Sequence, residues 1–244
     1  MGRGTGGYRG GNVGVTAVSI GTGSTAFVES FESASFADYP ASWGVSISDT
    51  AIGACRVIRV AGTGTTLPLL DVGPVTLSGG TGSAIVMTAN ATARNAYSNM
   101  QPGLRFALGD LVTAMASGSI AFAGNLTFPA AVTVTSPTAT PGTPIAISRT
   151  TDFTVRWTGT GADPVAVILT VSNRTAGTSS QLLCTFDRTT GIGVVPATTL
   201  GMIDAGAGQL AVVGVNTTRL TGTGNMPIEM TARNTTLAST AQVN

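Results

Sequence analysis

The sequence predicts an all-β protein of two β-sandwich, immunoglobulin-like domains in tandem, preceded by a flexible, Gly-rich N-terminal tail. Three observations carry this prediction. Short runs of alternating apolar and polar residues are broken by Gly, Pro, Asn and Asp at intervals of about 8–12 residues, which is typical of sandwiches. Threonine, a β-branched residue with high strand propensity, is about one residue in six. Sustained helical periodicity is absent.

The candidate strands follow from this alternation, because successive strand residues face opposite sides of a sheet. Phe153, Val155 and Trp157, for example, share one face. In the first half we expect strands at Val13–Ile20, Ala26–Phe31, Trp43–Ser48, Cys55–Val60, Val75–Leu77, Ala84–Thr88, Leu111–Met115 and Ile120–Phe128. In the second half we expect them at Ala131–Thr135, Ile145–Ser148, Phe153–Trp157, Val165–Val171, Gln181–Phe186, Leu210–Val215 and Met226–Thr231. One helical turn is expected at Pro196–Met202, because Pro is favoured at the first helical position.

Composition suggests how the chain divides. Residues 1–11 are a low-complexity Gly-rich segment that we predict to be disordered. Residues 12–129 form the predicted N-terminal sandwich and residues 130–244 the C-terminal one, because a Pro-rich stretch beginning at Pro129 separates two similar series of strands. A length of 244 residues is sufficient for two ordinary domains.

The charged residues exclude many kinds of chemistry. They make up 9% of the chain, all 12 basic residues are arginine, and histidine is absent. Without His and Lys there is no Ser-His or Cys-His dyad, no imidazole metal ligand, no Walker lysine and no Schiff base. The sequence therefore predicts no enzyme, no cofactor and no metal site. A net charge of +1 without a basic block predicts no nucleic-acid partner.

The sequence also bears on membrane insertion and on hydrolysis by paired carboxylates. No apolar run approaches the roughly 18 residues that would span a bilayer, so no membrane insertion is expected. A hydrolase that uses two converging carboxylates is an alternative. Most carboxylates, however, lie beside Gly, Pro or Thr at strand ends, as Asp110 and Asp163 do. We interpret them as turn residues, because Asp side chains form local hydrogen bonds with the backbone in turns.

The two cysteines, Cys55 and Cys184, lie in strand-like runs in different halves of the chain. One possibility is a disulfide between domains or subunits. The other is a pair of buried free thiols, because unpaired cysteine is among the most buried residue types. Leu182 and Phe186 share a strand face with Cys184, which favours burial. A catalytic thiolate is not expected, because no histidine can activate it.

Tyr39 and Trp43 are the candidate residues for a glycan-binding platform, because they place two amphipathic rings in a turn-like segment. The alternative is that Trp43 opens a strand and fills the first core. The chain has only 2 Trp, 3 Tyr and 8 Phe for two cores, so most of its aromatic residues must be structural.

Self-assembly is predicted from the lack of protection at strand edges. Soluble β proteins usually protect sheet edges with Lys, inward-pointing charges or Pro, and this chain has no Lys and few charges. Residues 13–31 follow the Gly-rich tail and could add a strand to a neighbouring subunit by β-augmentation. Alternatively, they begin the chain's own sandwich. The residues of this candidate assembly arm are Val13, Val15, Val18, Ile20, Phe27 and Phe31.

Short motifs in the second half carry a family resemblance. Thr154-Val-Arg-Trp-Thr-Gly is similar to a C strand with a core Trp, so this half resembles bacterial immunoglobulin-like or fibronectin-III-like domains. Followed by Cys184-Thr-Phe-Asp and Gly193-Val-Val-Pro-Ala-Thr-Thr-Leu, it also resembles two-domain secreted β-sandwich proteins of myxobacterial type. The resemblance covers most of residues 26–244, implies export and brings no catalytic residues. One Cys per half departs from the paired-Cys pattern of antibody domains.

The sequence thus predicts a non-catalytic extracellular or cell-surface structural protein that acts through protein–protein contacts. We expect a self-assembling subunit of a filament, sheath or matrix, whose partner is another copy of itself. Met1 leads into a polar Gly-rich stretch rather than a secretory leader, so export is inferred from composition. One alternative is a β-sandwich module that binds polysaccharide or another ligand, and a second is a virion structural protein.

Overall fold

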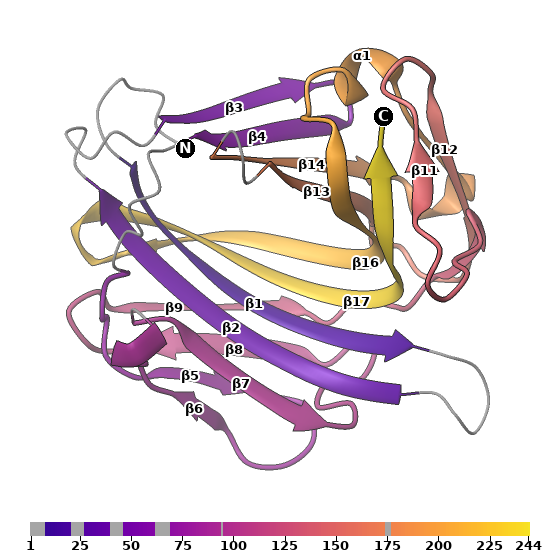
Figure 1. Ribbon diagram of the computed structural model, residues 1–244. Helices are drawn as coiled ribbons and strands as arrows, with labels where there is room; N and C mark the ends of the chain where they lie inside the picture. The colour runs from indigo at the N-terminus through magenta and orange to yellow at the C-terminus, as the bar shows by residue number, and fades with distance from the viewer. Residues whose placement is uncertain (1–7, 21–26, 40–45, 62–68, 94, 174–176) are drawn as a thin grey trace. The chain divides into compact units, whose positions relative to one another are not determined.

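The computed structural model describes residues 8–20, 27–39, 46–61, 69–93, 95–173 and 177–244 (Figure 1). The regular structure in these residues is almost entirely β-strand, which confirms the predicted fold class. The chain divides into two compact units, and each unit is built from separate segments. Unit 1 comprises residues 1–43, 66–129 and 215–234, and unit 2 comprises residues 44–65, 130–214 and 235–244.

Unit 1 is a sandwich of two sheets. One sheet has the order β6-β5-β8-β9, and the other contains β17, β1, β2 and β7 in that order. The strands are β1 (Tyr8–Ile20), β2 (Phe27–Tyr39), β5 (Val75–Ser78), β6 (Ile85–Met87), β7 (Tyr97–Pro102), β8 (Leu111–Ala116), β9 (Phe122–Thr127) and β17 (Met226–Val243), of which residues 226–234 belong to this unit. A short 3-10 helix, η3, spans Ala91–Ala93. Phe36 of β2 packs against Phe122 of β9 with ring centroids 5.6 Å apart, so the core joins the two sheets.

Unit 2 is also a sandwich. One sheet has the order β3-β4-β14-β13-β16, and the other has the order β10-β12-β15. The elements are β3 (Ser46–Ile52), β4 (Cys55–Ala61), β10 (Thr133–Ser136), β12 (Phe153–Thr158), β13 (Val165–Asn173), β14 (Thr178–Phe186), β15 (Ile192–Val195), η4 (Arg188–Thr190), α1 (Ala197–Leu200) and β16 (Gly206–Gly222), of which residues 206–214 belong to this unit. β11 (Ile145–Ile147) pairs in parallel with the end of β17, and η5 (Thr223–Asn225) follows β16. Trp157 and Val155 pack in one core with Val167 and Leu182 from the other sheet.

The two units differ from the predicted tandem domains 12–129 and 130–244 in two segments. The β3–β4 hairpin from the first half belongs to unit 2, and residues 215–234 from the second half belong to unit 1. The physical reason is long-range strand pairing, since β4 is the antiparallel neighbour of β14 over Cys55–Ala61. Pairing between strands that are distant in sequence does not change the local composition, so domain boundaries predicted from composition cannot include it.

Part of the Gly-rich tail is ordered in β1. Tyr8–Gly11 belong to this strand and pair with β2, so the prediction of disorder over residues 1–11 is wrong for these four residues. A Cβ atom on Gly11 would lie 2.5 Å from Cδ1 of Phe36. Glycine at this position therefore makes room for a buried ring, which is a known reason for glycine inside a strand. Residues 1–7 lie outside the described part of the chain.

Cys55 and Cys184 form a disulfide between the neighbouring strands β4 and β14. Both residues are buried and both belong to unit 2. The structure therefore has the disulfide rather than two free thiols, and places it inside one unit rather than between domains or subunits. The sequence could not decide this, because a separation of 129 residues says nothing about distance in the fold.

Arg188 is a buried arginine in unit 2 whose side chain holds the segment that begins at Ala130. Its side chain is packed so that the residue is 2% exposed, and burial lowers the pKa of its guanidinium, which still stays charged. The guanidinium donates hydrogen bonds to the backbone carbonyls of Ala130, Ala131, Thr160 and Asp163, over 2.8, 2.9, 3.2 and 2.8 Å. The carbonyl of Arg188 accepts one from the indole N–H of Trp157 at 2.9 Å. The Arg188 side chain thus joins two segments, residues 130–131 and 160–163, and its backbone carbonyl joins them to the core tryptophan.

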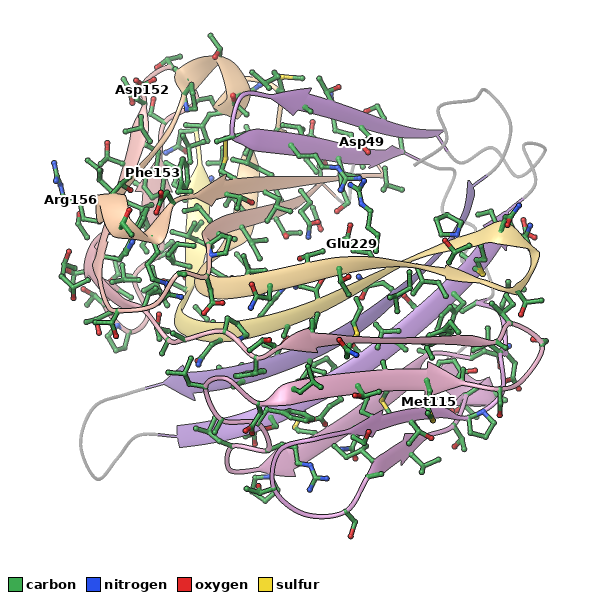
Figure 2. All side chains as sticks on the ribbon, turned by 180° about the vertical axis from the view of Figure 1, so that it is seen from behind. Asp49, Met115, Asp152, Phe153, Arg156 and Glu229 are labelled. Carbon is green, nitrogen blue, oxygen red and sulfur yellow. A yellow bond between two sulfur atoms is a disulfide. The ribbon has the colours of Figure 1, made fainter. Side chains whose placement is uncertain are left out.

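We predict that Arg188→Met destabilises the protein by about 3–5 kcal/mol, because it leaves the buried carbonyl of Ala130 and three partly buried carbonyls without their charged donor. Urea unfolding followed by circular dichroism measures the change. Arg156→Met is the matched control, because Arg156 on β12 is exposed and extends away from the ribbon (Figure 2). The control should stay within about 0.5 kcal/mol of the wild type. Equal stabilities of the two variants would show that the Arg188 hydrogen bonds are not needed.

Candidate functional site

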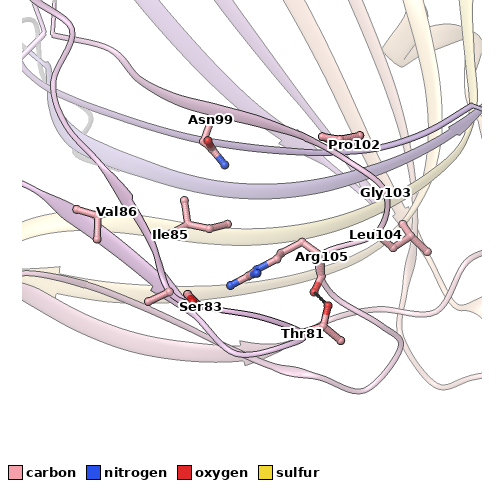
Figure 3. Close-up of a pocket in the computed structure, with 10 residues that line it drawn as sticks. Thr81, Ser83, Ile85, Val86, Asn99, Pro102, Gly103, Leu104 and Arg105 are labelled. Carbon is pink, nitrogen blue, oxygen red and sulfur yellow. Dashed lines mark hydrogen bonds between the residues drawn. The ribbon is translucent and has the colours of Figure 1, made fainter.

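The candidate site is a pocket in unit 1 with a volume of about 450 Å³. This volume falls in the range of roughly 300–1,000 Å³ that is usual for small-molecule sites. Its walls come from the β5–β6 connection with β6, and from β7 with the residues after it (Figure 3). The lining residues are Thr81, Ser83, Ala84, Ile85, Val86, Asn99, Pro102, Gly103, Leu104 and Arg105.

Both backbone groups of Arg105, the N–H and the C=O, are held by hydrogen bonds. Its N–H donates to the hydroxyl of Ser30 on β2 at 2.8 Å, and its carbonyl accepts from the N–H of Thr81 at 3.2 Å. Gly82 has a φ of +86°, and a Cβ there would lie 2.4 Å from Nη1 of Arg105. The β5–β6 connection therefore favours glycine at this position for its backbone conformation, and the guanidinium lies directly against it.

The guanidinium of Arg105 has unused hydrogen-bonding capacity. Its Nε and Nη2 atoms are buried and have no partner among the described residues. The same pair of nitrogens on Arg56 holds the carboxylate of Asp49 in a bidentate contact, at 2.7 and 2.6 Å. Buried donors without partners are uncommon in folded proteins, and each one calls for a specific explanation. Arg105 therefore marks the part of the pocket where a polar group would be stabilised.

Glu32 is a buried carboxyl on β2, next to this pocket. The residue is 0% exposed, and its Oε2 accepts a hydrogen bond from the amide of Asn99 at 2.9 Å. Its Oε1 is buried without a partner within the described part of the chain. Burial raises the pKa of Glu32, although the hydrogen bond from Asn99 and the positive charge of Arg105 oppose the rise. A carboxyl with a raised pKa beside a pocket is a typical feature of functional sites.

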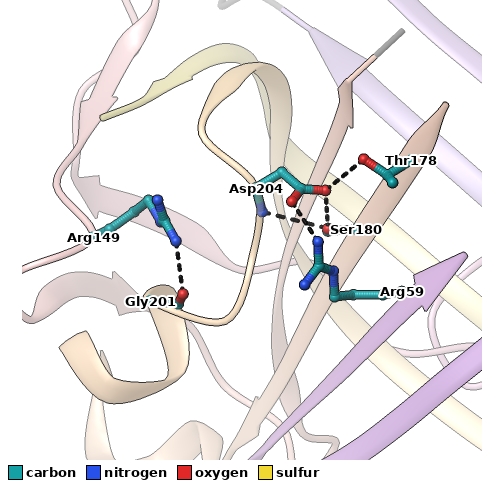
Figure 4. A network of polar contacts seen from close by, with 6 residues as sticks. All are labelled: Arg59, Arg149, Thr178, Ser180, Gly201 and Asp204. Carbon is teal, nitrogen blue, oxygen red and sulfur yellow. Dashed lines mark hydrogen bonds and ion pairs between the residues drawn. The ribbon is translucent and has the colours of Figure 1, made fainter. Parts of the chain in front are cut away.

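A second polar cluster, in unit 2, is saturated with partners (Figure 4). The carboxylate of Asp204 pairs with Arg59 at 2.6 Å and accepts hydrogen bonds from the hydroxyls of Thr178 and Ser180 at 2.9 Å each. Burial alone would raise the pKa of Asp204. The two hydroxyls and the charges of Arg59 and Arg149 outweigh burial, so this pKa lies below its ordinary value. The cluster fastens the segment after α1 to β4 and β14, and we assign it a structural role.

The outward side of the four-stranded sheet of unit 1 is a third feature, which we call the outer face. Val86, Met115 and Leu111 are 61%, 49% and 55% exposed on it, and Figure 2 shows Met115 on this sheet. The strand registers place uncharged side chains in rows across the sheet. The residues of the outer face are Thr76, Ser78, Val86, Leu111, Thr113, Met115, Ala123, Asn125 and Thr127. The outer face thus combines exposed apolar groups with hydroxyls and one amide.

The predicted glycan platform falls where the structure describes little. Tyr39 ends β2, but its side chain and the whole of Trp43 lie outside the described residues, so this platform stays a prediction.

Across the described residues, no three metal-ligating side chains gather at one place. In the same residues, no helix has the length and apolar character to cross a membrane.

The candidate assembly arm lies in the sheet of its own chain. β1 pairs with β2 over 13 residues, and Val13 and Val15 are buried in the core of unit 1. Val18 is half-buried and Phe31 is 37% exposed. The side chains of Ile20 and Phe27 lie outside the described residues. Of the two alternatives for the candidate assembly arm, the described residues 13–20 and 27–31 show the one in which they begin the chain's own sandwich.

The sequence reasoning missed Asn99 and Arg105, which line the pocket, and Glu32 beside it. Glu32 shares its strand face with Ala34 and Phe36, which are buried. A carboxyl at an inward position of an apolar alternation was therefore a usable signal. Asn99 and Arg105 lie in a polar stretch with no clear periodicity, and only the fold brings them to Glu32.

Comparisons with known proteins add little to this picture. The chain matches no family model and no curated protein. Among solved structures it is similar to the fibronectin(III)-like modules of Clostridium thermocellum CbhA, with 11% sequence identity and a TM-score of 0.19. The similarity covers 78% of this chain and 94% of that one. A TM-score this low carries no argument about function, and the fold assignment rests on the sheets themselves.

We predict that Glu32→Gln raises the melting temperature at pH 7, because it removes a buried group that must ionise. With its folded-state pKa raised, Glu32 costs stability above that pKa, and the cost disappears as the pH falls toward the unfolded value of about 4.3. The difference between variant and wild type should therefore shrink on acidification, measured by calorimetry. Glu29→Gln on the same strand controls for loss of one charge. A destabilised Glu32→Gln at pH 7 would contradict this account.

Proposed function

We propose that this chain is an exported, non-catalytic structural protein that acts through protein–protein contacts and associates with copies of itself. The observation that carries the proposal is the outer face, on which Leu111, Met115 and Val86 are about half exposed or more and no side chain is charged. Exposed apolar patches on soluble proteins commonly mark interaction sites. A surface without charge also has no like-charge repulsion when it meets a second copy of itself.

The disulfide supports an extracellular or cell-surface location. Disulfides form and persist in oxidising environments and are rare in reducing ones, and Cys55 and Cys184 are paired. The resemblance to secreted proteins of myxobacterial type agrees with this location. A filament, sheath or matrix is the assembly that we propose, and a virion structural protein is the alternative that would use the same kind of contact.

We expect Leu111→Glu to weaken self-association by about tenfold or more, since it places a charge on each of the two contacting surfaces and both charges must be desolvated. Sedimentation velocity over a series of concentrations measures the association. Leu108→Glu is the matched control, because Leu108 is 65% exposed in unit 1 but lies off the outer face. Wild-type protein that stays monomeric at every concentration would rule out the proposal.

The pocket favours a ligand-binding module as the second candidate function. Arg105 and Asn99 line the pocket, and the two buried guanidinium nitrogens of Arg105 have no partner among the described residues. Polysaccharide is the ligand class that we propose, because sugar hydroxyls both donate and accept hydrogen bonds and so suit an arginine beside a carboxyl.

Saturation-transfer NMR with a panel of neutral oligosaccharides tests this second candidate. We expect a transfer signal with the wild type that Arg105→Met loses, since the variant removes the donors. Arg219→Met is the control, because Arg219 is an exposed arginine of unit 1 that does not line the pocket. A panel without any signal, or a signal that Arg105→Met retains, would count against the pocket as a saccharide site.

A further inference from the structure

The edges of the sheets differ in how well they are protected. Exposed edge strands invite pairing with another chain, and proteins protect them by shortness, Pro, charge or a covering segment. Among the described residues, β6, β10 and β15 have only three or four residues each, and β7 ends at Pro102. β9 is covered, because the carbonyl of Thr127 accepts a hydrogen bond from Asn216 and a Cβ on Gly124 would touch Leu220.

Among the residues that the structure describes, β3 is the least protected of these edges. It is the terminal strand of its sheet, has seven residues, and contains neither Pro nor Lys. Its one charged residue, Asp49, is held by Arg56 of the adjacent strand β4 in a bidentate contact. The edge therefore presents a long strand whose charge is already neutralised within the hairpin.

The hairpin fixes which backbone groups of β3 point outward. Ile52 and Cys55 are opposite each other and flank a loop formed by Gly53 and Ala54. In such a hairpin the flanking pair is hydrogen-bonded, and bonded and non-bonded pairs alternate from there. Thr50 therefore bonds inward to β4, while the backbone N–H and C=O groups of Asp49 and Ala51 point away from β4.

We propose that β3 of a second copy pairs antiparallel with this edge, across a two-fold axis at Thr50. The proposal rests on the self-association proposed above and adds a second contact surface to the outer face. In this register Asp49 lies opposite Ala51 of the second copy, so the outward groups of both residues form hydrogen bonds across the axis. The register also keeps the two Asp49 side chains from lying directly opposite each other, where like charges are unfavourable.

A second copy is the occupant that fits this edge. An isologous contact uses the same patch on both partners, and two-fold dimers are the commonest soluble oligomers. Because Asp49 is paired with Arg56 in each copy, two identical edges meet without uncompensated charge. The pairing needs no side chain from any other protein.

Two cysteine variants test the register. Thr50→Cys places the two new thiols opposite each other at a non-bonded pair, where Cβ atoms are about 4.5–5.5 Å apart. We expect a covalent dimer after mild oxidation. Ser48→Cys is the matched control, because Ser48 shares a strand face with Thr50 but would lie opposite Ile52 of the second copy, so it should stay uncrosslinked.

Ala51→Pro tests the hydrogen bonds themselves. Proline removes the outward N–H of Ala51 while the inward bonds of Thr50 and Ile52 to β4 remain. We expect the dimer dissociation constant to rise roughly tenfold or more, because two symmetry-related hydrogen bonds are lost. Ala51→Ser, which keeps the N–H, should associate like the wild type. If Ala51→Pro does not fold, the two cysteine variants decide.

The outcomes separate this inference from the proposed function. Crosslinking of Thr50→Cys without Ser48→Cys, together with weaker association of Ala51→Pro, supports the β3 contact. Wild-type association that none of these variants changes or captures overturns the β3 contact and leaves self-association standing. A wild type that is monomeric throughout overturns both.

Discussion

Unit 2 depends on the disulfide between Cys55 and Cys184. The bond joins residues that are 129 positions apart, and closing a loop of that length stabilises the folded state by about 5 kcal/mol in the chain-entropy model. It secures β4 against β14, and β3 follows β4 through their hairpin. β3 becomes the edge of the sheet only because this pairing is made. The disulfide therefore reinforces the pairing that leaves β3 as the edge that we propose for self-association.

Alternation of apolar and polar residues was sufficient to find strands such as Phe153–Thr158, whose inward residues Val155 and Trp157 are buried. It failed where an inward position is polar or small. β2 continues to Tyr39, but Glu32 interrupts the apolar pattern, and the prediction stopped at Phe31. β1 includes Gly11, which makes room for the ring of Phe36, and a Gly-rich composition conceals this requirement. Local pattern thus fixes strand identity better than strand length.

The site was harder to predict than the strands, because its parts come from distant segments. Glu32 and Asn99 are 67 residues apart and meet only because β7 pairs with β2. The cysteines pose the same difficulty, since burial was predictable from the strand face of Cys184 but the choice of partner was not. Composition, in contrast, was informative about what the chain lacks. The chain has no Lys, and Arg56 neutralises Asp49, so β3 carries no unpaired charge that would oppose pairing with another strand.

The two proposed contacts together would lead to a polymer rather than to a closed dimer. An isologous contact occupies the same patch on both copies, so a chain with one such contact forms a closed dimer and no larger assembly. The outer face and the β3 edge consist of different residues in different units, so filling one does not consume the other. A copy joined to one neighbour through β3 can join another through Leu111 and Met115. Two isologous contacts on one chain thus provide what growth of a filament or sheath requires.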